Sequence, residues 1–236
     1  PDLERSLSRP LGHPVQIGSY EGLRPWGLAI GPSKILPTTK DRSTGSLDQL
    51  VVRLDPLASL RRWQPVFALD VSGVRVQLRR DDQGRYWTPG SAMAPRTLPR
   101  IRLNVRFIQP AQVSLSPVGE SFRLSGRGAV ELADSWFSSS ARLQWLDQGG
   151  AVALQARGRW DQPQLILRTG LKDLKLNRLA GLLSLPTTAE VQGRLDGDLR
   201  LQLQQGRLGC RGGVQFQDIQ VSRDKGSEPL RSKRLS

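Results

Sequence analysis

The stretch of sequence that decides the fold runs from Val191 to Leu203 and reads VQGRLDGDLRLQL. Every odd position in it is apolar or Gly, and every even position is Gln, Arg or Asp. A strict period of two is typical of a β-strand that has one dry face and one wet face. We therefore predict a strand here, with Val191, Leu195, Leu199, Leu201 and Leu203 on its dry face.

The same alternation occurs in several other stretches of the chain. It is carried by Val74, Val76 and Leu78, by Ile101, Leu103, Val105 and Phe107, by Phe122 and Leu124, and by Val214 and Phe216. Turn residues at 81–84, 147–150 and 205–207 separate these stretches at short intervals, as hairpins require. The pattern predicts a mainly antiparallel β protein.

Helix is scarce in the predicted structure. Short helices are expected at 56–61, with Asp55 as N-cap before Pro56, and at 178–183. Both are flanked by strand patterns, which suggests two internal repeats, about 1–130 and 131–222, within one elongated β-rich region. The last residues, 223–236, are expected to form a polar, flexible tail.

The apolar face of such a sheet must be covered, and helices this short cannot cover it. A closed sandwich or barrel covers the face with the sheet itself, and closed architectures are the commoner solution. A long curved sheet whose apolar side receives acyl chains is the other solution. The alternation alone does not distinguish the two.

The composition limits the classes of function. The 236 residues hold 35 Lys and Arg against 21 Asp and Glu, giving a formal charge of +14, and 29 of the basic residues are Arg. The charge is spread along the chain, without a recognition helix or a series of stacking aromatic residues, which disfavours nucleic-acid binding. A solvated polar face is the default interpretation, and attraction to anionic lipid headgroups is the alternative. A single Cys excludes a disulfide framework.

Candidate catalytic residues are few. His13, the only His, lies among turn residues and is expected at the surface, and Cys210 is expected as a small buried residue on the dry side of its strand. Asp196 and Asp198 share a strand face with Arg194 and Arg200, which favours mutual charge compensation over acid–base chemistry. With no nucleotide-binding motif, metal-ligand spacing or cofactor motif, we expect a protein that is not an enzyme.

Several short motifs resemble, in their order, those of the TamB family, AsmA-like proteins of Gram-negative envelopes, in the version found in cyanobacteria and chloroplasts. They are Pro14-Val15 with Ile17-Gly18, Glu21-Gly22, Pro25 with Gly27, Gly31-Pro32-Ser33, Leu54-Asp-Pro-Leu57, the hairpin from Arg80 to Trp87, and Leu179 to Pro186 followed by Gly193 and Gly197. The resemblance spans most of the chain.

The resemblance implies an elongated, curved antiparallel sheet with an apolar groove (a β-taco) and one or two short helices. It further implies a periplasmic bridge, anchored in the inner membrane, that carries phospholipid acyl chains and supports outer-membrane biogenesis together with a β-barrel insertase. The alternative is a scaffold for protein assembly or translocation that works through exposed strand edges. No apolar run of about 20 residues, as an anchor requires, occurs in this sequence.

If the groove exists, its expected lining is the dry-face set already identified, with the arginines outside or along the rim. Gly193, Gly197 and Gly212 on the same side are expected to leave room for mobile chains. The lining set is Val74, Val76, Leu78, Ile101, Leu103, Val105, Phe107, Phe122, Leu124, Val191, Leu195, Leu199, Leu201, Leu203, Val214 and Phe216.

Overall fold

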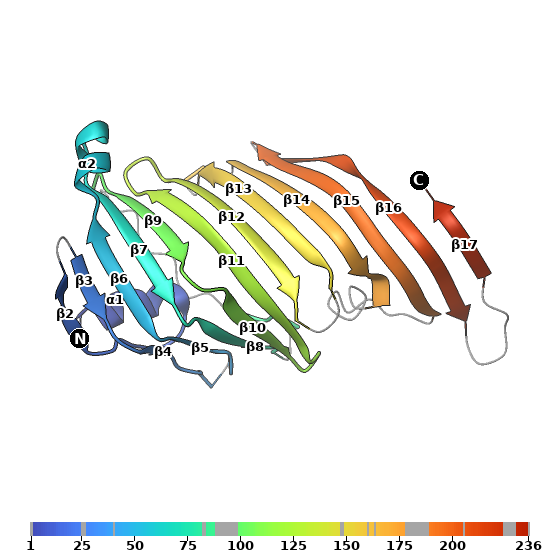
Figure 1. Ribbon diagram of the computed structural model, residues 1–236, viewed down its shortest axis with the longest axis horizontal. Helices are drawn as coiled ribbons and strands as arrows, with labels where there is room; N and C mark the ends of the chain where they lie inside the picture. Colours follow the sequence, from blue (N-terminus) through green and yellow to red (C-terminus); the bar gives the residue numbers. More distant parts are fainter. Residues whose placement is uncertain are drawn as a thin grey trace.

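A computed structural model describes the chain as one long β-sheet that runs from the N-terminal to the C-terminal end of the molecule (Figure 1). The structure is mainly β, with 66% of residues in strands and 8% in helices, and the sheet is mixed and not closed. The described residues are 2–24, 27–39, 41–81, 84–87, 99–146, 149–159, 161–162, 164–177, 189–204, 206–223 and 230–235.

The sheet contains seventeen strands, and two helices, α1 (Asp2–Leu11) and α2 (Pro56–Arg62), accompany it. The strands are β1 (Val15–Gln16), β2 (Tyr20–Arg24), β3 (Gly27–Ile30), β4 (Ser33–Ile35), β5 (Thr44–Leu47), β6 (Gln49–Leu54), β7 (Val66–Ser72), β8 (Arg75–Arg79), β9 (Arg102–Phe107), β10 (Ala111–Ser116), β11 (Glu120–Glu131), β12 (Trp136–Trp145), β13 (Ala151–Arg159), β14 (Gln164–Lys175), β15 (Ala189–Gln204), β16 (Arg207–Arg223) and β17 (Leu230–Leu235).

The C-terminal half of the sheet is the antiparallel meander that the alternation predicts. Each strand from β11 to β17 pairs with the next one along the chain. The decisive stretch lies within β15, and its partner β16 joins it through the turn at Gly206, whose φ is 75°. Of the three predicted hairpin turns, 147–150 and 205–207 connect paired strands.

The third predicted turn, 81–84, does not join a hairpin. It follows β8, and the chain then crosses over so that β9 lies parallel to β7 and β10 lies parallel to β8. Parallel strands need a crossover connection, and no local residue signal specifies where a crossover occurs. The sheet is therefore mixed and not wholly antiparallel.

In the N-terminal half, long strands bend midway, and each bend divides one strand into two shorter ones. β5 and β6 are separated by Asp48, while β7 and β8 are separated by Gly73, whose φ is 64°, and Val74. After the bends, β8 and β10 pair on one half of the sheet while β7 and β9 pair on the other, and both β9 and β10 pair with β11. The expected repeats 1–130 and 131–222 thus differ in connectivity.

The helices are short and lie at the margins. In α2, Asp55 caps the first turn by accepting a hydrogen bond from the Ala58 backbone N–H at 2.9 Å, as expected. The sequence analysis did not anticipate α1, which Ser8 connects to β1 by accepting a hydrogen bond from the Val15 N–H at 2.9 Å. The predicted helix at 178–183 lies outside the described residues.

The molecule buries little of its surface for its size. Its accessible surface is 16,445 Å², about 1.5 times the roughly 10,500 Å² expected of a compact chain of 26.1 kDa. A closed sandwich or barrel, the architecture that composition alone favours, is therefore wrong for this chain. Residues 223–236, expected as a polar tail, contribute the last residue of β16 and all of β17.

Candidate functional site

One face of the sheet carries the predicted lining residues; we call it the apolar face. Val76 lies directly opposite Val113, Val113 lies directly opposite Phe122, and Phe122 lies directly opposite Trp145. Directly opposite residues point to the same side of a sheet. The same reasoning across β9, β11 and β12 to β16 places the remaining members on this face.

All sixteen predicted residues are compatible with this face. Val74 and Ile101 immediately precede β8 and β9 and continue their alternation. The position of Val191 is given by its backbone pairing with Val221. The others lie within strands, with their side chains on the apolar face.

Part of the apolar face is a well-packed cluster. Phe122, Trp145, Leu174 and Leu195 are its buried centre, with exposed fractions of 3, 7, 2 and 7%. The rings of Phe122 and Trp145 pack edge to face, with centroids 4.8 Å apart. Twelve residues form the cluster: these four together with Val113, Leu115, Leu143, Val152, Leu171, Leu176, Val214 and Phe216.

The prediction included four members of the cluster, Phe122, Leu195, Val214 and Phe216, and missed the others. The missed residues lie mainly on β10 and on β12 to β14. On β12, Ser and Ala occupy both faces of the strand and weaken the alternation. A signal for them was available in the sequence. Val152 and Leu154 are two residues apart, and so are Leu143 and Trp145, which is the spacing of residues on one face of a strand.

The rest of the apolar face is only half-buried. Leu103, Val105 and Phe107 on β9 and Leu199, Leu201 and Leu203 on β15 all have intermediate exposure. Among the described residues, α1 makes its main contacts with β1 and α2 makes its main contacts with β7. The apolar face therefore combines a packed region with a region that is open to occupation.

The glycines on this face do not leave room, contrary to expectation. A Cβ at Gly193 or Gly197 would lie 3.1 or 2.6 Å from a backbone oxygen of β16, and a Cβ at Gly212 would overlap the backbone oxygen of Asp198. Gly212 also has a φ of 149°, which side-chain-bearing residues rarely adopt. Close approach of β15 and β16, and not free space, explains these glycines.

The opposite face, which we call the polar face, carries the charged residues. Asp196 accepts a hydrogen bond from the Asp173 backbone N–H at 2.8 Å, and Arg194 pairs with the Asp173 carboxylate at 3.4 Å, so the ion pair of Arg194 joins β15 to β14. On β13, Arg159 donates hydrogen bonds to Asp161 at 3.0 and 2.7 Å, which lowers the pKa of the Asp161 carboxyl.

His13 is buried, and the surface location expected for it is wrong. Its exposed fraction is 1%; Nε2 lies 3.2 Å from Oδ2 of Asp41, and Nδ1 lies 3.1 Å from the Leu36 backbone oxygen. The ring also packs against Trp87, with centroids 4.3 Å apart. Partners 23 to 74 residues away in the sequence bury this side chain, which its local turn sequence does not reveal.

Cys210 is exposed, whereas burial was expected. It does lie on the apolar face, opposite Leu201, but the first half of β16 has no described strand on its outer side, since β17 begins to pair only at Phe216. An edge strand leaves side chains on both of its faces accessible.

In the described part of the chain, no group of three His, Cys, Asp or Glu side chains is arranged to hold a metal ion. The described helices likewise include none with the length and apolarity needed to cross a membrane. Searches of protein-family models, curated proteins and solved structures found no match to this chain.

Proposed function

We propose that this chain is a non-enzymatic segment of a periplasmic bridge between the inner and outer membranes, and that its apolar face carries phospholipid acyl chains. One observation carries the proposal: the sheet is not closed, and much of its apolar face is only half-buried. Contact of such an apolar surface with water is unfavourable unless something apolar occupies the surface.

The energetics favour such a surface as a lipid path. Moving an acyl chain of roughly 16 carbons into water costs on the order of 12 kcal/mol, at about 0.8 kcal/mol per CH₂. Ten strands, from β3 to β16, follow one another across the apolar face. At about 4.8 Å between strands they span about 43 Å. A path of that length lowers the free-energy cost of moving an acyl chain through water, and it needs no reactive side chain.

The proposal includes TamB-like membership and a sheet curved into a groove. The ordered motifs of the sequence support the membership, and the one-sided alternation supports the groove. The proposal also includes contacts with the inner membrane and with an outer-membrane β-barrel insertase. We assign these contacts to none of the described residues.

A charge placed on the apolar face tests the proposal. Leu199 is half-buried on β15, and Gln202 lies on the polar face of the same strand. Mass spectrometry of the purified chain is expected to find bound phospholipid in the native protein and in Gln202→Arg, and to find it lost in Leu199→Arg. Equal lipid in both folded variants would contradict the proposal.

A second function, a scaffold for outer-membrane protein assembly, is favoured by one specific observation. Residues 207–215 of β16 have no described partner on their outer side, and Leu208 is 71% exposed. An unpaired edge can add a strand from another chain. Binding of extended peptides that is abolished by Gly209→Pro, in a chain that holds no lipid, would favour the scaffold over the lipid path.

A further inference from the structure

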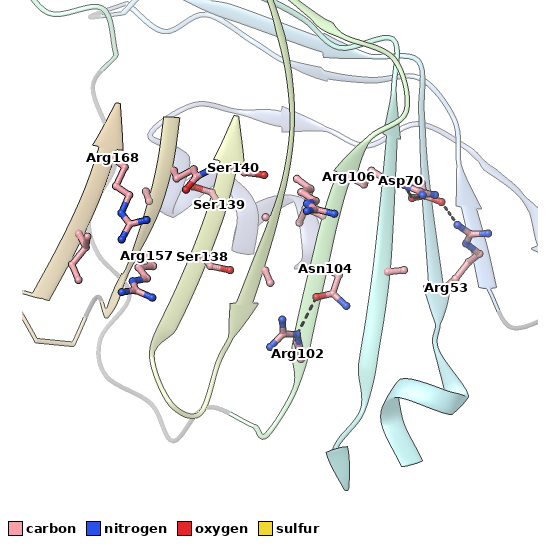
Figure 2. A pocket seen from close by; sticks show the side chains of 18 residues that line it. Arg53, Asp70, Arg102, Asn104, Arg106, Ser138, Ser139, Ser140, Arg157 and Arg168 are labelled. Carbon is pink, nitrogen blue, oxygen red and sulfur yellow. Dashed lines mark hydrogen bonds and ion pairs between the residues drawn. The ribbon is translucent and has the colours of Figure 1, made fainter. Parts of the chain in front are cut away.

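The polar face contains a hollow of about 690 Å³, seen from close by in Figure 2. It lies on the side of the sheet opposite the apolar face and extends from β6 to β14. Six arginines line it, and we call it the arginine hollow: Arg53, Arg102, Arg106, Arg127, Arg157 and Arg168.

Side-chain size explains why a hollow forms on an open face. Ala68, Ala129 and Ser138 lie in one row across β7, β11 and β12, with Asn104 of β9 between the two alanines. Their short side chains form a floor, and the long arginine side chains of the neighbouring positions stand around it. The lining contains no aromatic ring, which weighs against a nucleobase as occupant.

Three of the six arginines already pair with a carboxylate. Asp70 pairs with Arg53 and also with Arg106, the latter at 3.0 Å. Arg102 pairs with Glu131 and donates a hydrogen bond to Asn104 at 3.0 Å.

The side chains of Arg127, Arg157 and Arg168 have no hydrogen bond or ion pair among the described residues. All three side chains are exposed. The hollow is therefore lined by six guanidinium groups and by one carboxylate, that of Asp70, because Glu131 lies outside the lining and also pairs with Arg62. Its uncompensated charge is concentrated toward β11, β13 and β14.

The strand register brings like charges together. Arg127 lies directly opposite Arg106, and Arg168 lies directly opposite Arg200 on β15. Like charges in directly opposite positions destabilise a sheet. A bound anion would remove this repulsion.

Arg157 and Arg168 are placed to share one anion. Arg168 lies directly opposite Gln155, so Arg157 is its diagonal neighbour on β13, within reach of long side chains. Ser138 of β12 lies directly opposite Arg157, and in Figure 2 the guanidinium groups of Arg157 and Arg168 lie next to each other. Two planar forks together with hydroxyl donors match the several acceptor oxygens of a phosphate group.

We propose that the arginine hollow binds a phosphate group through Arg157 and Arg168, with Arg127 adding charge. Its volume lies within the range of about 300–1,000 Å³ usual for small-molecule sites, which leaves room for a phosphate attached to an organic group. The carrier is a phosphorylated small metabolite or the headgroup of an anionic phospholipid. This site is separate from the lipid path proposed for the apolar face, because the two lie on opposite sides of the sheet.

Titration calorimetry on the purified chain tests the proposal with probes that have no acyl chain. The probes are sn-glycerol 3-phosphate, a phosphate monoester, and glycerophosphoglycerol, the diester headgroup of phosphatidylglycerol. At least one should bind saturably. Stronger binding of the monoester identifies a small metabolite as the source, and stronger binding of the diester identifies a lipid headgroup.

The test variant is Arg157→Gln with Arg168→Gln, expected to weaken binding at least tenfold. The control is Arg123→Gln with Arg142→Gln, which removes a second pair of exposed, diagonal arginines from the polar face outside the hollow. The control should weaken binding less than threefold. Equal weakening in both double variants, or no saturable binding of either probe to the native chain, would overturn the proposal, while thermal unfolding verifies that every variant is folded.

Discussion

Phe122→Ala and Phe107→Ala remove the same side chain from two places on the apolar face, and we predict very different losses of stability. Phe122 is 3% exposed and packs on Trp145 at the centre of the cluster, whereas Phe107 is half-buried on β9. Truncating a fully buried Phe costs about 3–5 kcal/mol, since both transfer free energy and a cavity contribute. Phe107 is partly in contact with water already and its truncation leaves no closed cavity, so Phe107→Ala should cost less, about 1–2 kcal/mol.

Urea unfolding followed by far-ultraviolet circular dichroism measures both free energies of unfolding. The two variants serve as controls for each other, because the chemical change is identical and both positions lie on the same face. A closed core would make both positions expensive. Equal losses, near 3 kcal/mol or more at each position, would refute the conclusion that the apolar face is packed at the cluster and open elsewhere.

Four further predictions concern single residues. His13→Ala should lower the free energy of unfolding by about 3 kcal/mol, measured in urea, because it leaves the carboxylate of Asp41 buried without the imidazole. Trp63→Gly should raise it by about 1 kcal/mol, because Trp63 is 89% exposed and has a φ of 53°; a lower melting temperature would contradict this. Gly212→Ala should lower the melting temperature by several degrees, since its Cβ would overlap backbone atoms of β15. Cys210 should react with a thiol reagent in the folded chain as fast as in urea, and strong protection would contradict its exposure.

Local patterns were sufficient to predict most of the strands. The alternation from Val191 to Leu203 falls within β15, and the turn chemistry at 205–207 joins β15 to β16. Asp55 before Pro56 predicted the start of α2. These features depend on residues within one turn or one strand, where sequence spacing determines geometry directly.

Features that depend on distant residues were not predicted. The parallel pairing of β7 with β9 follows from a crossover whose ends are 30 residues apart, and the burial of His13 depends on Asp41 and Trp87. The exposure of Cys210 depends on β17 pairing only with the second half of β16. In each case the local sequence is compatible with both outcomes.

The sequence predicted which side of the sheet carries the candidate site, but it did not predict the shape of that surface. Alternation assigns side chains to a face, so the predicted lining residues share one side of the sheet. It does not determine which of them pack together, and Trp145 and Leu174, two of the four buried residues of the cluster, were missed. The arginine hollow was missed because it arises from the alignment of short side chains on four different strands, β7, β9, β11 and β12.

The most direct test of the proposed lipid path is photocrosslinking at two adjacent positions of β15. Leu201 faces the apolar side and Gln202 the polar side. A photoreactive benzoylphenylalanine placed at either position reports what touches that face in the cell envelope. The proposal predicts a phospholipid adduct at position 201 and none at 202; an adduct at 202 alone, or none at either position, would contradict it.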